Sequence, residues 1–400
     1  MKKLPGHLRD KYEALLLVRP EWKGWARPLS NQQIAEWEQQ FKATLPAEFI
    51  ALLTEIGDRA PVSRHHALIP LAEAVPQLHR LGPAGPIHEP FPFTGDEPVD
   101  LPWDDDADEY ADPYALRGCI PLLDDGCGTV DLLVVTGPER GRMWRFVPGG
   151  TQELRPLSRG LPRWYEDLLD VERAADDRRR QEIAALEATL LANPGDDQSA
   201  LALASLVETE APERALTLLR GVLTRHPDAP PARERLARLL FARGEYQELI
   251  DAFNGSPRID LFRGASQELR GDHEAALATL RHASAGPLSP LELGFAHHYL
   301  ARAHLHAGDP GRAREEARHA SIDADTYAII AAASAQLGRN EEAIKAAEEA
   351  LRWMEPALAR RPGELRAGSP HPAVLTREEL LALKERCLRA LSRSGGRDCP

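Results

Sequence analysis

The segment from Glu89 to Asp112 combines carboxylates with aromatic rings and contains no Lys or Arg. Aromatic side chains bury a large area at protein interfaces, and clustered carboxylates attract a basic partner and speed its encounter. The pattern therefore predicts a surface that binds a basic protein. Its candidate partner-binding residues are Phe91, Phe93, Trp103, Asp104, Asp105, Asp106, Asp108, Glu109 and Tyr110.

Two other interpretations of this segment stay open. In the first, the carboxylates are simply solvated and the aromatic side chains pack onto a neighbouring sheet. In the second, Asp104, Asp106 and Asp108 bind calcium, because they have the alternate spacing of the first ligands of a calcium loop, although the Gly and distal Glu of an EF-hand are missing. The segment belongs to a proline-rich connection, residues 62–116, and connections of this length usually have a function or are disordered.

Catalytic chemistry has little support in the sequence. The chain contains no GxSxG, Walker loop or HExxH motif, and no GxGxxG after a strand. Cys127 has no assignable histidine base and is interpreted as a core residue. His297 and His298 diverge by about 100° on a helix, and together with His304 and His306 they are interpreted as a packed or solvated face rather than a metal site. We expect no catalytic residue, no cofactor and no metal.

The elements that position the acidic segment are strands and helices on either side of it. Residues 117–146 contain three short strands separated by two glycine turns, and Thr129–Val135 is apolar on both faces, which predicts a central strand. Upstream, Ser30 with Gln33 forms a capping-box pattern. Pro46 begins a second helix, which ends at Gly57.

Three stretches carry a resemblance to a known family. They are GCGTVDLLVVTGPERGRMW at 126–144, LPAEFIALLTEIG at 45–57 and LPRWYEDLLD at 161–170. In this order they resemble the SUKH superfamily, the family of the Smi/Knr cell-wall-assembly regulators. The resemblance implies an α+β domain with a twisted antiparallel sheet flanked by helices. In bacteria such domains are mostly immunity proteins that neutralise polymorphic toxins, often nucleases.

The second half of the chain is predicted to be all-α. The segments GDHEAALATLRHAS, GDPGRAREEARHAS and GRNEEAIKAAEEAL align and resemble the turn and second helix of tetratricopeptide (TPR) repeats. Weaker copies run through Ala215 with Pro227 and through Gly244. The clear glycines lie 37 and 30 residues apart, so we expect degenerate repeats. The matched positions are Gly271, Ala276 and Ala283; Gly308, Ala313 and Ala320; Gly338, Ala343 and Ala350.

These patterns predict four parts of the chain. Residues 172–180 (ERAADDRRR), where the SUKH-like domain gives way to the repeats, are expected to be an exposed boundary. Leu375–Leu391, amphipathic through Leu380, Leu381, Leu383, Cys387 and Leu391, is expected to cap the array. The parts are an N-terminal extension (1–28), the SUKH-like domain (29–170), the TPR-like repeats (171–355) and a loosely ordered linker with the capping helix (356–400).

Composition limits the class of partner and the location. A formal net charge of −13 argues against nucleic-acid binding through a basic surface and fits a basic protein partner. The N-terminus has too short an uncharged run for a signal peptide, and no stretch is long and apolar enough for a membrane span. These two absences lead us to expect a soluble, cytoplasmic protein. The four cysteines show no CxxC spacing and fall into two groups far apart in the sequence, so we expect reduced thiols.

Three functions are compatible with these features. The first is an immunity or antitoxin-like protein whose SUKH-like domain binds and neutralises a toxin, with the repeats as an additional scaffold. The second is a regulatory TPR adaptor unrelated to toxins. The third, an enzyme, is disfavoured by the missing motifs. The first two use the same mechanism, burial of complementary surface, and the sequence does not separate them.

Overall fold

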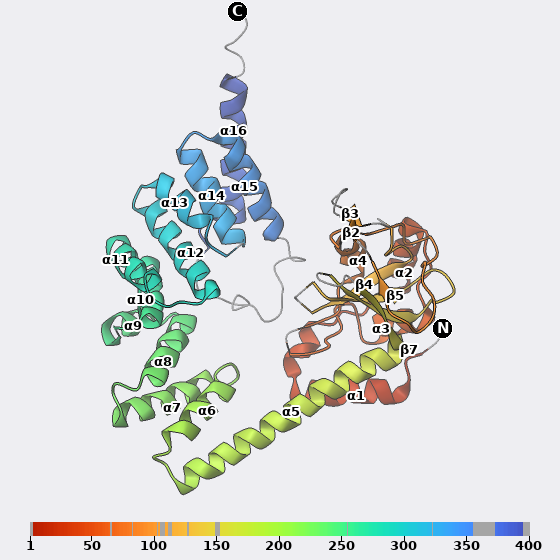
Figure 1. The fold of residues 1–400 in the computed structure, drawn as a ribbon, viewed down its shortest axis with the longest axis horizontal. Helices are drawn as coiled ribbons and strands as arrows, with labels where there is room; N and C mark the ends of the chain where they lie inside the picture. The colour runs from red at the N-terminus through yellow and green to blue at the C-terminus, as the bar shows by residue number, and fades with distance from the viewer. Residues whose placement is uncertain are drawn as a thin grey trace, which may run out of the picture. The chain divides into compact units, whose positions relative to one another are not determined.

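The computed structural model divides into two compact units, with the division between Arg178 and Arg179 (Figure 1). The first unit has one hydrophobic core, and the second has two. The structure describes residues 3–64, 66–81, 83–101, 103–104, 109–110, 114–125, 128–148, 153–253, 255–321, 323–354 and 373–394.

A five-stranded antiparallel sheet is the framework of the first unit. Its order is β1-β7-β6-β5-β4. Strand β5 (Val130–Val134) lies between β4 and β6, and all its residues are buried, as expected for a strand that is apolar on both faces. The prediction of a central strand is confirmed. The other strands are β1 (Val99–Asp100), β4 (Cys119–Asp124), β6 (Arg142–Val147) and β7 (Glu153–Gly160).

A buried carboxylate joins this sheet to helix α5 (Leu161–Ala192). Asp131 on β5 is 1% exposed. It accepts hydrogen bonds from Arg145 Nε at 2.6 Å and from Trp164 Nε1 at 2.9 Å. Tyr165, the next residue of α5, donates its hydroxyl proton to the carbonyl oxygen of Pro61 at 2.9 Å. A buried charge needs such partners, so the Trp-Tyr pair fixes how α5 packs on the sheet.

The helices before the sheet begin and end close to the residues that the capping and turn patterns of the sequence predict. Ser30 and Gln33 form the predicted capping box at the start of α2 (Asn31–Phe41). Pro46 is the N-cap of α3 (Ala47–Glu55). Gly57 follows with φ +135°, and a Cβ there would lie 2.6 Å from the backbone of Arg27, so only glycine fits. A fourth helix, α4 (Leu71–Leu78), completes this group.

The sequence sets residues 1–28 apart as an extension, but the described residues 3–28 pack into the core of the first unit. They form α1 (Gly6–Val18) and a short 3₁₀ helix, η1 (Pro20–Gly24). Leu8 and Trp22 are fully buried in that core. The ammonium of Lys11 binds Glu166 and Asp170 of α5 at 2.6 and 2.7 Å, and hydrogen bonds to Asp170 and then Glu166 raise the pKa of Lys11.

Helix α5 runs without a break through the segment expected to be an exposed boundary. Glu172 and Asp176 within it are only 8% and 5% exposed. The expectation of an exposed boundary is wrong at these two residues, because their acidic side chains face basic groups of the first unit, Arg19 and Arg64. Charge alone does not show that a segment is solvated.

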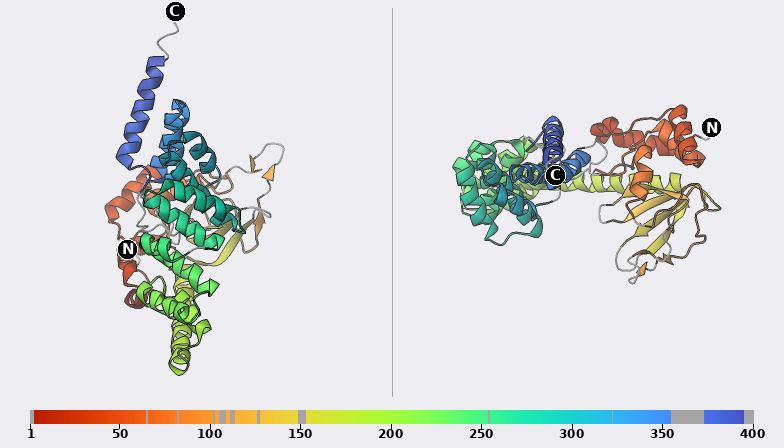
Figure 2. Two further views of the ribbon diagram at one scale, coloured as in Figure 1. Left: turned by 90° about the vertical axis from the view of Figure 1, so that its left-hand side faces the viewer. Right: turned by 90° about the horizontal axis from the view of Figure 1, so that it is seen from above.

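The second unit is a succession of helices packed against one another in chain order, from α6 to α16 (Figures 1 and 2). Helix α10 packs on α11, α12 on α13 and α14 on α15. This arrangement confirms the all-α repeat fold. The helices are α6 (Asp197–Val207), α7 (Pro212–Arg225), α8 (Pro230–Arg243), α9 (Tyr246–Ala252), α10 (Pro257–Leu269), α11 (His273–Ser284), α12 (Pro290–His306), α13 (Pro310–Ala317), α14 (Ala324–Gln336), α15 (Asn340–Trp353) and α16 (Arg377–Ser394).

The aligned repeat positions occupy equivalent places in these pairs. Gly271, Gly308 and Gly338 have φ values of +87°, +79° and +72° and each separates the two helices of a pair. The small residues at the matched positions let paired helices approach, and one of them departs from the pattern. Ala320 lies beyond the end of α13 and is half-buried, because α13 is shorter than α11 and α15. The fully buried ones are Ala276, Ala283, Ala313, Ala343 and Ala350.

Helix α16 covers the last pair, as expected of a cap. Leu380, Leu383 and Cys387 are buried against α14 and α15. Leu381 is 49% exposed, so it does not belong to the buried stripe in which the sequence pattern places it. None of the helices within the described residues has the length and apolar character required to cross a membrane.

Candidate functional site

The acidic segment begins in the core of the first unit. Phe91 is 2% exposed, and its ring centroid lies 5.2 Å from that of Trp144 on β6. Phe93 is half-buried and lies 5.6 Å from Phe91. The sequence pattern predicts that both rings lie on a partner-binding surface. For Phe91 this prediction is wrong, because its ring is buried in the core and cannot contact a partner. Its part is to hold the segment on the sheet.

Backbone contacts also hold the segment on the sheet at Phe91. The N–H of Phe91 donates to the carbonyl oxygen of Thr136 at 2.9 Å. Gly118, just before β4, passes so close that a Cβ would lie 2.5 Å from the carbonyl oxygen of Glu89 and from the nitrogen of Phe91. Any larger residue at Gly118 would therefore push the segment away from the sheet.

Beyond this anchor the segment forms short strands. After β1, Leu101 is buried, and β2 (Trp103–Asp104) then pairs with β3 (Glu109–Tyr110). Trp103 lies opposite Tyr110 and Asp104 opposite Glu109 in the register. The candidate residues Asp105, Asp106 and Asp108, and with them two of the three possible calcium ligands, lie outside the described residues.

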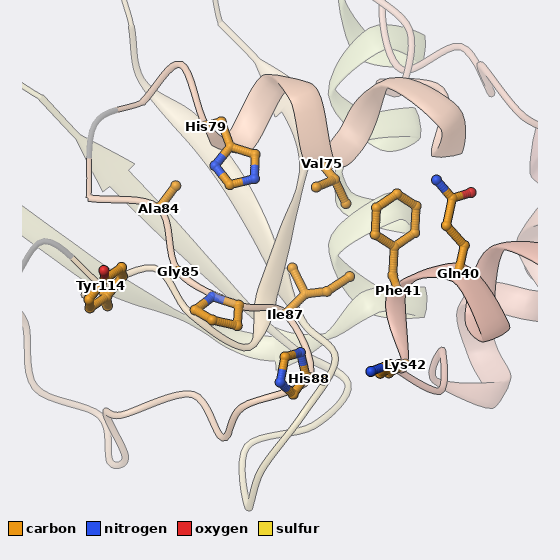
Figure 3. Close-up of a pocket in the computed structure, with 11 residues that line it drawn as sticks. Gln40, Phe41, Lys42, Val75, His79, Ala84, Gly85, Ile87, His88 and Tyr114 are labelled. Atoms are coloured by element: carbon orange, nitrogen blue, oxygen red, sulfur yellow. The ribbon is translucent and has the colours of Figure 1, made fainter.

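A pocket of about 440 Å³ lies at the base of the segment (Figure 3). The two flanks of the segment line it, Ile87 with His88 before the acidic residues and Tyr114 after them. The end of α2 contributes Phe41, and α4 contributes Val75. Sequence reasoning missed this pocket, because its residues come from separate stretches and no local pattern joins them.

The pocket has an apolar floor and a polar rim. Val75 and Ile87 are buried and Phe41 is half-buried. The rim side chains are exposed, and Tyr114 is 55% exposed. An apolar floor with a few polar groups around it is typical of sites that accept one side chain of a partner or a small ligand. The other exposed rim residues are Gln40, Lys42, His79 and His88.

One acidic residue of the segment is attached to the sheet. Asp96 pairs with the guanidinium of Arg142 on β6, which also binds Glu139 at 2.6 Å. The bonds with Glu139 and then Asp96 raise the pKa of Arg142. The side chain of Asp96 is still 87% exposed, so it remains available to a partner.

The described cysteines do not offer a nucleophile. Cys119 is fully buried and its thiol donates to the carbonyl oxygen of Leu116 at 3.0 Å. Burial raises its pKa far above the ordinary value, so the thiol stays protonated and unreactive at neutral pH. Burial also raises the pKa of the Cys387 thiol on α16. Cys127, interpreted from the sequence as a core residue, lies outside the described residues.

The histidine-rich face of α12 has buried and partly exposed members. His298 and His304 are 5% and 3% exposed, with His298 Nδ1 3.2 Å from Thr326 Oγ1. His297 Nδ1 lies 2.7 Å from a carboxylate oxygen of Glu316. His306 is different, because it shares a buried carboxylate with His273, a residue that no sequence pattern singled out.

Comparison with known proteins agrees with the first half of the structure. Residues 28–167 match the model of the SMI1/KNR4 family (SUKH-1). The N-terminal part therefore has a SUKH-like domain, and the resemblance stated from its motifs is confirmed. The helical array follows this domain as a TPR-like set of degenerate repeats. No curated protein matches the chain.

Three solved structures are similar to the chain at low identity. PilW, a widely conserved type IV pilus biogenesis factor, is 20% identical, with 48% of this chain and 94% of that chain covered and a TM-score of 0.38. A tetratricopeptide repeat protein from Parabacteroides merdae is 14% identical, with 58% and 86% covered and a TM-score of 0.33. The APC/C hetero-tetramer Cut9-Hcn1 is 17% identical, with 57% and 48% covered and a TM-score of 0.37.

Proposed function

We propose that this protein works by binding another protein, without catalysis, and that its SUKH-like domain carries the main binding surface. The partner we propose is a basic, nuclease-like toxin domain whose active site the protein covers, as immunity proteins do, in the cytoplasm. One observation carries the proposal. A pocket with an apolar floor is lined by residues that flank, in the sequence, a segment with ten carboxylates and no Lys or Arg.

The two parts of this surface have different physical roles. An anchor side chain that fills the pocket becomes fully desolvated, and such an anchor contributes about 2 kcal/mol or more to binding. Exposed carboxylates of the segment, such as that of Asp96, act mainly on the association rate and are screened by salt. A partner with a basic patch beside one protruding apolar or aromatic side chain satisfies both parts.

A second function is favoured by an aromatic cluster in the array. The rings of Phe241 on α8, Phe262 on α10 and Phe295 on α12 lie 5.6 to 5.8 Å from one another. Phe262 and Phe295 are only half-buried. Rings presented by three helices of the array suit an extended peptide, so the alternative is a TPR adaptor unrelated to toxins.

The test first looks for a toxin-like gene beside this one, and then measures the association and dissociation rates of the purified toxin domain with the full chain. We expect Asp104→Lys, Asp105→Lys and Asp106→Lys together to slow association by about tenfold or more, with a weaker salt dependence. The matched control changes three exposed acidic residues elsewhere in the first unit, Asp10, Glu13 and Glu36, to Lys. This control variant changes the net charge by the same amount, and its association rate should stay close to that of the wild type.

Two further variants separate the pocket from the hairpin and from the array. Ile87→Asp places a charge in the pocket floor and should speed dissociation without changing the salt dependence. Phe262→Ala and Phe295→Ala should leave toxin binding unchanged. Rates that respond only to the array variants would support the adaptor function, and a toxin that remains active when coexpressed with the protein would reject the immunity function.

A further inference from the structure

Glu268, near the end of α10, is a buried carboxylate shared by two histidines. Its side chain is fully buried, and its two oxygens lie 2.6 Å from His273 Nδ1 and 2.6 Å from His306 Nδ1. The two imidazole rings have centroids 4.9 Å apart. The candidate ligand atoms of all three side chains lie within 4.8 Å of one another.

The repeat turns bring these residues together. Glu268 lies three residues before the turn glycine Gly271, and His273 is the first residue of α11. His306 is the last residue of α12, two positions before the next turn glycine, Gly308. The cluster therefore joins one helix pair to the next at the ends of their helices, where the chain reverses direction.

Two imidazoles and one carboxylate are the ligand set of many zinc sites. His273 and His306 are 29% and 39% exposed, whereas Glu268 is fully buried. A cation at this point would thus be held from the inside by the carboxylate and approached by solvent from the outside. Three protein ligands with an open outer position leave room for water or for a group of a binding partner.

We propose that Glu268, His273 and His306 form a binding site for one divalent transition-metal ion of the zinc class. Each imidazole offers Nδ1 as a ligand when its proton lies on Nε2. Zinc holds such donors at about 2.0–2.2 Å, so the short hydrogen bonds between the imidazoles and the carboxylate give way to ligand contacts when the ion enters. The bound ion ties α10, α11 and α12 together.

Arg302 sets a limit on the affinity. Its Nε lies 3.8 Å from a carboxylate oxygen of Glu268, and its side chain is 5% exposed. The positive charge of this guanidinium partly neutralises the carboxylate and repels the metal ion, which lowers the affinity of the site. A hard ion such as Mg²⁺, which prefers oxygen ligands and retains its water, has no advantage at this site.

The test measures zinc bound to the full chain after chelator treatment, by equilibrium dialysis and metal analysis. We expect one tightly held Zn²⁺ in the wild type, no comparable Mg²⁺, and a rise in the melting temperature of the array with zinc. Co²⁺ should give visible absorption bands of an ion with nitrogen and oxygen ligands. Glu268→Gln and the double variant His273→Gln with His306→Gln should lose this ion.

A matched control exists in the same array. His282 also faces a buried carboxylate, with Nδ1 3.0 Å from Asp260 Oδ2, but no third His, Cys, Asp or Glu of the described residues lies close enough to complete a metal site with this pair. His282→Gln should therefore keep the bound ion.

Single variants keep the proposal testable if a ligand variant unfolds. In that case the change of half-exposed His306 to Gln should still weaken zinc binding by about tenfold or more. The proposal is overturned if the wild type binds no zinc, or if folded ligand variants bind as much zinc as the wild type. The cluster would then be a hydrogen-bonded network without a metal.

Discussion

Arg19 and Asp176 form a buried ion pair, with Arg19 Nε 3.1 Å from Asp176 Oδ2. Their side chains are 6% and 7% exposed, although 157 residues separate them in the chain. Glu172, one turn earlier on α5, lies 3.6 Å from the same guanidinium. The N-terminal segment is thereby fastened to the helix that leaves the first unit.

Removing Asp176 should destabilise the first unit. Asp176→Ala removes the carboxylate that pairs with buried Arg19, and breaking a buried pair in this way costs about 3–5 kcal/mol. Urea unfolding followed by tryptophan fluorescence measures the effect, because six of the seven tryptophans lie in the first unit. Glu182→Ala, an exposed change further along α5, is the control and should cost under about 0.5 kcal/mol. Equal midpoints for the two variants would show that the pair does not hold the segment.

The two units are proposed to fold independently. Arg178 and Arg180 are exposed on α5 at the division, so brief trypsin treatment should cut there and leave two resistant fragments. Mass analysis identifies the cut. A variant with Gln in place of Arg178, Arg179 and Arg180 should resist cleavage at this point. One resistant fragment that includes both the sheet and helices α6 to α15, in the wild type, would contradict independent folding.

The helix pair α14 and α15 allows a direct test of the repeat alignment. Ala343 is fully buried, so Ala343→Arg forces a long charged side chain between packed helices and should cost more than about 3 kcal/mol. The sequence places Glu342 toward solvent, but its carboxylate lies 2.8 Å from Arg314 Nη1. The better control is therefore exposed Glu341, and Glu341→Arg should change the melting temperature little. Thermal unfolding by circular dichroism compares them, and similar melting temperatures would reject the alignment at this position.

Acid should weaken the array through His304. Burial, and then the charge of Arg281, lowers the pKa of His304 below its ordinary value. The unfolded chain therefore binds this proton more readily than the folded chain, so stability falls as the pH falls below the unfolded value of about 6.5. We expect the melting temperature of His304→Gln to depend less on pH than that of the wild type between about pH 7 and pH 5. If the melting temperature of this variant depends on pH as strongly as that of the wild type, groups other than His304 cause the loss of stability in acid.

Much of the fold could be predicted because its signals are local. The apolar residues on both faces of Thr129–Val135 identified β5, and Ser30 with Gln33 marked the start of α2. The turn glycines of the repeats marked where one helix ends and the next begins, since only glycine readily adopts their positive φ. Each of these features depends on residues that are close in the sequence.

The surface predictions depended on contacts that are not local. Phe91 and Trp103 both belong to one acidic and aromatic segment, yet the ring of Phe91 is buried on Trp144. No residue near Phe91 in the sequence indicates this contact, because Trp144 is 53 residues away. Likewise, the charged residues 172–180 have the composition of an exposed linker, and the approach of Arg19 and Arg64 from distant parts of the chain explains why Asp176 is buried.

The sequence by itself determined the order of elements, the SUKH-like and TPR-like halves and the acidic character of the segment. The tertiary structure decided which side chains meet. The pocket beside the segment draws Phe41, Val75 and Ile87 from three separate stretches, and the carboxylate of Glu268 meets histidines from two other helices. Helix and strand formation follow from backbone geometry and the spacing of neighbouring residues, whereas a site requires side chains whose separation is set only when distant elements pack.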